Sequence, residues 1–110
     1  MKTLLIGLAT VATLATGTLQ AADAPKTGDA KRGESKNAMC IGCHGISGYR
    51  TAFPEVYRVP KIGGQHAEYI VAALKAYQEG ARNHPSMKGV AASLTEQDML
   101  DLAAYYSKQK

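Results

Sequence analysis

The stretch Cys40-Ile41-Gly42-Cys43-His44 decides the fold, because it brings two thiols and an imidazole together within one short segment. In a C-x-x-C-H pattern, thiols three positions apart on a turn of helix can each add to a vinyl group of haem. The adjoining imidazole then lies under the iron as its proximal ligand. The motif therefore predicts one haem c, attached covalently through Cys40 and Cys43, with His44 on the iron.

Other uses of a Cys-x-x-Cys pair fit the flanking sequence less well. A thioredoxin-like redox pair would precede a helix within a βαβ pattern, and no β-rich segments flank this pair. Half of a zinc ribbon would need a second ligand pair, but the remaining histidines, His66 and His84, are not paired. A structural disulfide would close only a two-residue loop and would remove little entropy from the unfolded chain.

The N-terminal segment has the three-part layout of a secretory signal peptide. Lys2 gives it a basic end, and an apolar stretch and then small residues follow. The apolar stretch is shorter than the roughly 18 residues that a membrane span needs. We expect residues 1–21 to be a signal peptide, cleaved after Ala21 or Ala22, and residues 22–110 to be the mature domain. Leu19 is not ideal for such cleavage, so an uncleaved N-terminal anchor is the alternative.

The composition of the mature segment indicates a small domain that needs a prosthetic group. The chain has no Trp and one Phe. A domain this small buries only a modest fraction of its surface and usually needs an additional stabilising group. A buried haem would supply the missing apolar volume. The formal net charge is +4, and the charges are scattered, so we expect no nucleic-acid site and no stable membrane insertion.

The second axial ligand must come from elsewhere in the chain. Met1 would leave with the signal peptide, and Met39 adjoins Cys40 on the attachment side. Met99 falls on the apolar stripe of a helical pattern, where a methionine usually fills the core. His66 is expected to open a helix and to face solvent.

His84 and Met87 remain as candidates, within segment 82–89. This segment lies between two helical patterns and has no apolar periodicity of its own, so we expect an irregular loop, stiffened by Pro85. We predict Met87 as the axial ligand, with His84 or an open site as alternatives. Thioether ligation favours ferrous iron and raises the reduction potential relative to bis-histidine ligation.

Helical periodicity elsewhere predicts an all-α fold. A first helix is expected from about Ala30 to Met39, capped by Asp29 or Thr27. A second is expected over about 67–78, ended by Gly80, and a third follows the capping-box pattern at Thr95-Glu96-Gln97-Asp98. The apolar positions of the third helix are Met99, Leu102, Ala103 and Tyr106.

In their order along the chain, these features resemble class I cytochromes c, in particular the bacterial cytochrome c-553 group and the single-haem half of cytochrome c4. The similarity covers nearly all of residues 28–107. It rests on Gly28-Asp29 and Gly33, the Cys40–Gly45 motif, Pro60-Lys61-Ile62-Gly63-Gly64-Gln65, the Met87 segment and the run from Leu94 to Tyr106. The resemblance implies a class I cytochrome c fold, with three main helices wrapped round one covalently bound haem.

The resemblance also implies roles for single residues. Gly33 would let the first helix cross the last at close range, with Tyr105 packed across the gap. The carbonyl of Pro60 would accept a hydrogen bond from the His44 ring, with Pro54 as a weaker candidate. The residues that could neutralise the haem propionates, or could have no such role, are Tyr49, Arg50 and Arg58.

These features predict a periplasmic mono-haem protein that carries single electrons between respiratory redox partners and is not an enzyme. Its contacts with donor and acceptor should be small and short-lived. One alternative is a dedicated haem subunit of an oxidoreductase complex. Another is a small haem enzyme from which the methionine ligand is displaced.

Overall fold

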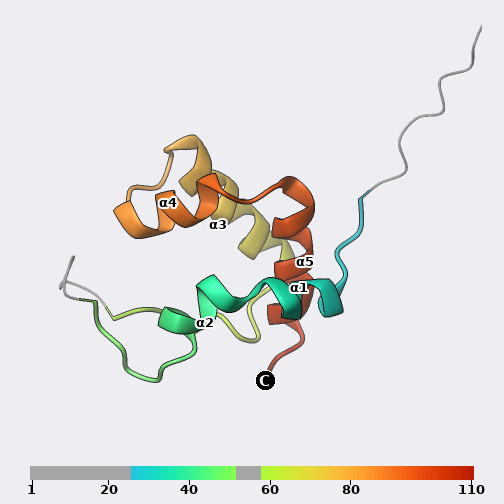
Figure 1. The fold of residues 1–110 in the computed structure, drawn as a ribbon, viewed down its shortest axis with the longest axis horizontal. Helices are drawn as coiled ribbons and strands as arrows, with labels where there is room; N and C mark the ends of the chain where they lie inside the picture. The colour runs from blue at the N-terminus through green and yellow to red at the C-terminus, as the bar shows by residue number, and fades with distance from the viewer. Residues whose placement is uncertain (1–25, 52–57) are drawn as a thin grey trace, which may run out of the picture.

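The computed structural model describes residues 26–51 and 58–110, and the secondary structure of these residues is entirely helical. The expected signal peptide and Pro54 lie outside the described residues. No helix in the described part of the chain is long and apolar enough to cross a membrane. The helices, shown in Figure 1, are α1 (Ala30–Lys36), α2 (Ala38–His44), α3 (Ala67–Glu79), α4 (Pro85–Ala92) and α5 (Glu96–Ser107).

The N-terminal helical segment is divided in two, so the prediction of one helix from Ala30 to Met39 was wrong. Asn37 separates α1 from α2, and its N–H donates to the carbonyl of Glu34 in a tightened final turn. The Asn37 carbonyl then accepts from the N–H of Cys40 at 2.8 Å, which starts a new helix. As a result, the whole C-x-x-C-H motif lies on α2.

Both ends of α3 and the start of α5 agree with the predicted ones to within a residue. Gly80 ends α3 at a φ of 83°, a left-handed conformation that favours glycine. Thr95 begins α5 with a complete capping box, in which Asp98 takes the place of the usual Glu or Gln. The all-α class is therefore confirmed, and α2 and α4 are two helices beyond the three that were predicted.

The first and last helices cross at Gly33. A Cβ on Gly33 would overlap the backbone carbonyl of Asp101 and would lie 2.8 Å from the Cβ of Tyr105, so only glycine allows this approach. The close crossing implied for Gly33 and Tyr105 is therefore present. In Figure 1, α1 lies directly against α5.

Asp101, which is fully buried, holds this crossing together. Its carboxylate accepts hydrogen bonds from the Arg32 Nε at 2.9 Å, the Asp29 N–H at 2.8 Å and the Gln97 amide at 2.8 Å. The Arg32 guanidinium, with help from the other donors, holds the pKa of the Asp101 carboxyl well below its usual range. A buried charge with this many donors is satisfied, so it fixes the register of α1 on α5.

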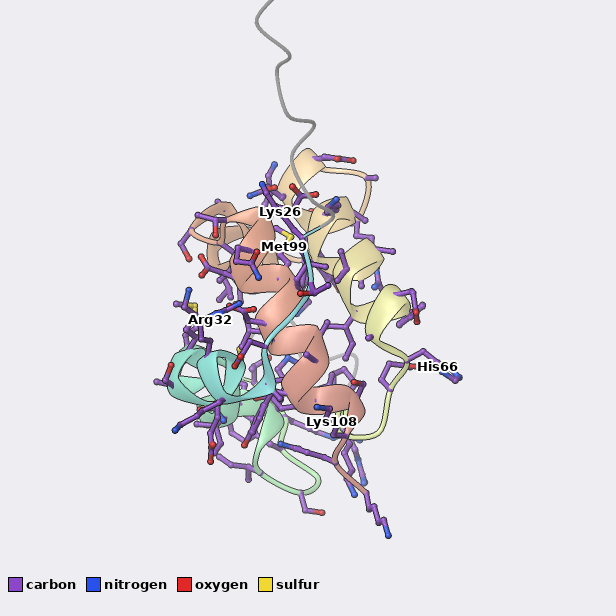
Figure 2. The ribbon with its side chains drawn as sticks, turned by 90° about the vertical axis from the view of Figure 1, so that its right-hand side faces the viewer. Lys26, Arg32, His66, Met99 and Lys108 are labelled. Atoms are coloured by element: carbon purple, nitrogen blue, oxygen red, sulfur yellow. The ribbon has the colours of Figure 1, made fainter. Side chains whose placement is uncertain are left out.

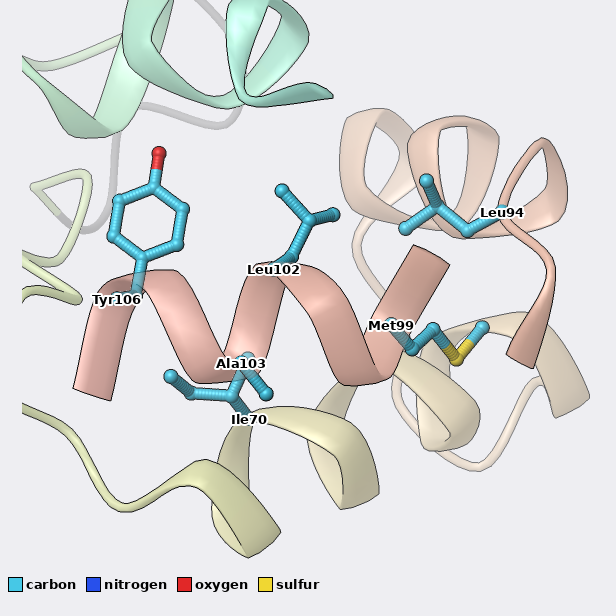
Figure 3. Close-up of a cluster of buried hydrophobic side chains, with 6 residues drawn as sticks. All are labelled: Ile70, Leu94, Met99, Leu102, Ala103 and Tyr106. Carbon is cyan, nitrogen blue, oxygen red and sulfur yellow. The ribbon is translucent and has the colours of Figure 1, made fainter. Parts of the chain in front are cut away.

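The apolar core lies between α5 and the helices α3 and α4 (Figure 3). Met99 is only 1% exposed, which confirms it as core filler. The side-chain amide of Gln78 on α3 donates to the carbonyls of Ala91 and Leu94, and so ties the end of α4 to α3. The buried cluster consists of Ile70, Leu94, Met99, Leu102, Ala103 and Tyr106.

Candidate functional site

A cleft of about 310 Å³ opens between α2 on one side and α3 and α4 on the other, with α5 behind it. Its volume is at the lower end of the range for small-molecule and cofactor sites. Cys40, Cys43 and His44 line it from α2, and Met87 lines it from α4. Five residues predicted for the haem site, from three separate segments of the sequence, therefore line the same cleft: Cys40, Cys43, His44, Pro60 and Met87.

The geometry of α2 explains why both thiols face the cleft. Residues three apart on a helix lie on the same face, so Cys40 and Cys43 point in one direction. Both are half-buried free thiols. Burial raises the pKa of the Cys40 thiol, and the influence of the Tyr106 side chain partly opposes this shift. The thiols of Cys40 and Cys43 therefore both face the cleft, at the spacing that attachment to the two vinyl groups of haem requires.

His44 is the last residue of α2, and its ring is held by a backbone carbonyl. The ring Nδ1 lies 2.7 Å from the carbonyl oxygen of Pro60, the contact that the family resemblance implies. In the tautomer that donates from Nδ1, the lone pair is on Nε2, which can then serve as a ligand atom. A hydrogen bond of this kind fixes the orientation of a ligating imidazole and increases its basicity.

Met87 lies in the first turn of α4, so the prediction of an irregular loop over 82–89 was wrong. Pro85 occupies the first helical turn, where its missing N–H is not needed. His84 is the N-cap, and its Nδ1 accepts from the N–H of Met87 at 3.3 Å. His84 and Pro85 were the sequence features that could have indicated the start of a helix. The helix itself has only eight residues, including Gly89, and shows too little apolar periodicity to be recognised.

The other candidate ligands have different positions. Met39 is half exposed and lines the cleft from the same helix as the cysteines. His66 is exposed at the start of α3 and projects away from the molecule, as expected (Figure 2). His84 is engaged with its own helix and is absent from the described lining of the cleft. The described residues contain no cluster of three or more His, Cys, Asp or Glu that could hold a metal by itself.

The charged residues that line the described part of the cleft are both cationic. They are Lys61 and Arg82, and the Arg82 guanidinium lies 4.8 Å from the centroid of the Tyr77 ring. Of the candidates for the propionates, Arg58 lines a second cavity of about 300 Å³ beside His44. Tyr49 and Arg50 line neither cavity. The sequence did not identify Lys61 and Arg82 as site residues, because nothing in a scattered distribution of cations shows which of them will line a cleft.

The residues present fit a large, flat, mainly apolar group attached through thiols. Aliphatic side chains of α3 and α5, among them Ile70 and Leu102, face the cleft. The buried hydroxyl of Tyr106, also in the lining, has no hydrogen-bond partner among the described residues. The two thiols and the imidazole are the groups that attach and ligate haem c, and the apolar walls would pack against its ring.

Comparisons with known proteins agree with this geometry. The family model described as "Cytochrome c" matches residues 30–110. A cytochrome c4 from Thiocapsa roseopersicina is 43% identical over 89 residues, which is 80% of this chain and 44% of that protein. Cytochrome c-554(548) from Halomonas halodenitrificans is 41% identical over 86 residues, which is 76% of this chain and 99% of that protein. The chain thus spans less than half of the cytochrome c4 and nearly all of cytochrome c-554(548).

A solved structure also matches. Reduced recombinant cytochrome c4 from Pseudomonas stutzeri superimposes with a TM-score of 0.62 at 34% sequence identity, covering 76% of this chain and 47% of that one. Fold and site together define a class of protein, the helical proteins that hold haem through thioether bonds. Within that class, the chain belongs to the cytochrome c family and has the class I fold. Its cofactor is covalently bound haem c, and Cys40 and Cys43 fit the attachment motif.

Proposed function

We propose that this cytochrome is a periplasmic one-electron shuttle in which His44 and Met87 are the two axial ligands of a single haem iron. The observation that carries the proposal is the shared cleft, which His44 lines from α2 and Met87 from α4. Bound haem supplies the Fe(II)/Fe(III) couple. With both axial positions filled, no position is left for a substrate, and this favours a carrier over an enzyme.

The chain's own residues would set the properties of this couple. Pro60 holds the His44 ring through Nδ1, and the capped first turn of α4 holds Met87. Lys61 and Arg82 add positive charge beside the site. Positive charge in a low-dielectric cleft favours the state with one more electron. Together with thioether ligation, these features predict a fairly high reduction potential.

The test is the weak charge-transfer band that sulfur on ferric iron gives at the red end of the visible spectrum. The oxidised wild type should show the band. Met87→Ala should lose it and should have a lower reduction potential. Met39→Ala is the matched control, because Met39 also lines the cleft but lies on α2, and this variant should retain the band. A wild type without the band, or an unchanged Met87→Ala spectrum, would overturn the ligand assignment.

The proposed location depends on the sequence of residues 1–21. We propose that these residues are a signal peptide and that the mature domain is 22–110. Mass spectrometry of the haem-loaded protein from the periplasm of an expressing bacterium should show cleavage after Ala21 or Ala22. A protein that stays in the membrane fraction with its N-terminus intact would instead support an N-terminal anchor.

A dedicated haem subunit is the second candidate, and one observation favours it. Met39 and Ile41 on α2 are about half exposed next to the attachment motif. Exposed apolar side chains beside the site are the kind of surface that a permanent interface would cover. Affinity purification of the cytochrome from periplasmic extract distinguishes the two, since a stable stoichiometric partner would overturn the free-carrier proposal and its absence supports a transient donor and acceptor.

A further inference from the structure

The buried side chain of Tyr106 has a donor that the protein does not use. Tyr106 lies on α5 and is 6% exposed, and its hydroxyl has no hydrogen-bond partner among the described residues. Buried tyrosine hydroxyls usually have a partner, and an orphaned one calls for an explanation. A phenylalanine would fill the same space without an unpaired O–H.

The direction of the ring limits what the partner can be. In Figure 3 the hydroxyl of Tyr106 points away from α5, towards the segment that contains α1 and α2. Tyr106 also lines the cleft, as does Cys40 on α2, and Cys40 packs against the buried cluster to which Tyr106 belongs. Burial, with a smaller effect from Cys40, raises the pKa of Tyr106 to about 12. The hydroxyl therefore keeps its proton over the whole physiological pH range and remains a donor.

Attachment of haem changes the chemistry of the neighbouring sulfur. A free Cys40 thiol has its own proton, whereas a thioether sulfur has none and can only accept. A permanent donor beside a sulfur that can only accept forms a complementary pair. Among the described residues, the Tyr106 hydroxyl has no competing acceptor.

We propose that Tyr106 is a positioning residue that donates a hydrogen bond to the thioether sulfur of Cys40 and thereby tunes the haem. The inference rests on covalent attachment at Cys40 and does not depend on which residue is the second axial ligand. Hydrogen bonds to the atoms that hold a cofactor are one of the means by which a protein sets a reduction potential. A donor at this sulfur withdraws electron density from the attached edge of the ring, so it favours the reduced state.

Tyr106→Phe is the decisive variant, because it removes one oxygen and leaves the ring in the core. Its reduction potential should fall. At a fixed applied potential the ratio of reduced to oxidised protein should drop about threefold, as expected for the loss of one weak neutral hydrogen bond. Tyr105→Phe is the matched control. Tyr105 packs edge-on against Tyr106 with ring centroids 5.0 Å apart, but it does not line the cleft, and its loss of a hydroxyl should leave the potential unchanged.

A second measurement identifies the acceptor. The carbon–sulfur stretching bands of the attached haem, seen by resonance Raman spectroscopy, should shift in Tyr106→Phe and not in Tyr105→Phe. In a Cys40→Ala background, in which Cys43 alone holds the haem, adding Tyr106→Phe should have no further effect on the potential. If that effect persists, the acceptor is not Cys40 and the proposal is wrong. The proposal is also wrong if Tyr106→Phe leaves both potential and Raman bands unchanged.

These outcomes are independent of the ligand assignment. If Tyr106→Phe keeps the sulfur-to-iron band and its potential shifts, both proposals are supported. If the band is present and the potential does not move, only the role of Tyr106 fails. If the wild type lacks the band, the Met87 assignment fails, while the comparison of Tyr106→Phe with Tyr105→Phe still decides the role of Tyr106.

Discussion

The crossing of α1 and α5 and the cleft between α2 and α4 are held together in opposite ways. At the crossing, Gly33 allows the two backbones to come into contact, and a buried carboxylate, Asp101, is satisfied by donors from both helices. At the cleft, α2 faces α3 and α4 across a space of about 310 Å³ with apolar walls. The chain thus completes its own packing on one side and leaves the other side to be completed by the haem.

The largest effect should come from removing the haem. A Cys40→Ala, Cys43→Ala double variant cannot attach it, so the apolar walls of the cleft would be left to water. A domain this small buries too little other apolar surface to compensate for this loss. We expect loss of the cooperative thermal transition and of most near-ultraviolet circular dichroism. Cooperative melting close to that of the holoprotein would show that the crossing suffices to hold the fold.

A side chain at the crossing should have the next largest effect. Gly33→Ala forces α1 away from the Asp101 carbonyl and should lower the free energy of unfolding by about 3 kcal/mol, as overpacking does. Denaturant unfolding of the holoprotein measures it. Gly89→Ala on α4 is the control, because a Cβ there has no neighbour within 4 Å, and it should be neutral or slightly stabilising. Equal effects of the two substitutions would contradict the tight crossing.

Removal of the charge of Asp101 tests the polar part of the same contact. Asp101→Asn keeps the shape but weakens the bonds to Arg32 and the Asp29 N–H, and should reduce stability by about 2 kcal/mol near neutral pH. Because the folded-state pKa of Asp101 is lowered, its contribution is complete above the unfolded-state pKa of about 4 and is lost as the pH falls towards the folded-state pKa. Below about pH 4 the stabilities of wild type and variant should therefore converge. A constant difference down to pH 2 would argue against this assignment.

The smallest effect is expected at the edge of the cleft. His84→Ala removes the cap of α4 and should reduce stability by about 1 kcal/mol. Because the cap bonds the N–H of Met87, the sulfur-to-iron band should also weaken on mild heating. His84→Asn supplies another good N-cap and should restore both properties. If His84 were instead the axial ligand, both variants would lose the low-spin spectrum of the wild type.

The features predicted well from sequence are those with a local signal. The C-x-x-C-H motif needs only adjacent residues, and the ends of α3 and α5 follow from Gly80 and the Thr95 capping box. The division at Asn37 was missed because residues on both sides suit a helix, and the break depends on one tightened turn.

Features that depend on distant partners were not visible in the sequence. In the sequence, Asp101 looks like any solvent-facing acidic residue of an amphipathic helix. Only its pairing with Arg32 and Asp29, about 70 positions earlier, explains its burial. The same holds for Tyr106, which the helical pattern identified as core but could not place in the lining of the cleft. The family resemblance supplied the Gly33 crossing and the Pro60 contact, which periodicity could not.

The pairing of Asp29 with Asp101 also sets an order of events during synthesis. The N–H of Asp29 and its acceptor are 72 residues apart, so this contact cannot form until α5 has been made. Because α5 also forms the back of the cleft, a growing chain has neither the crossing nor a complete haem site. Contacts between distant segments form late, since closing so long a loop costs entropy before any contact compensates for it. Until its last helix is complete, the chain therefore keeps both cysteines accessible to any apparatus that attaches the haem.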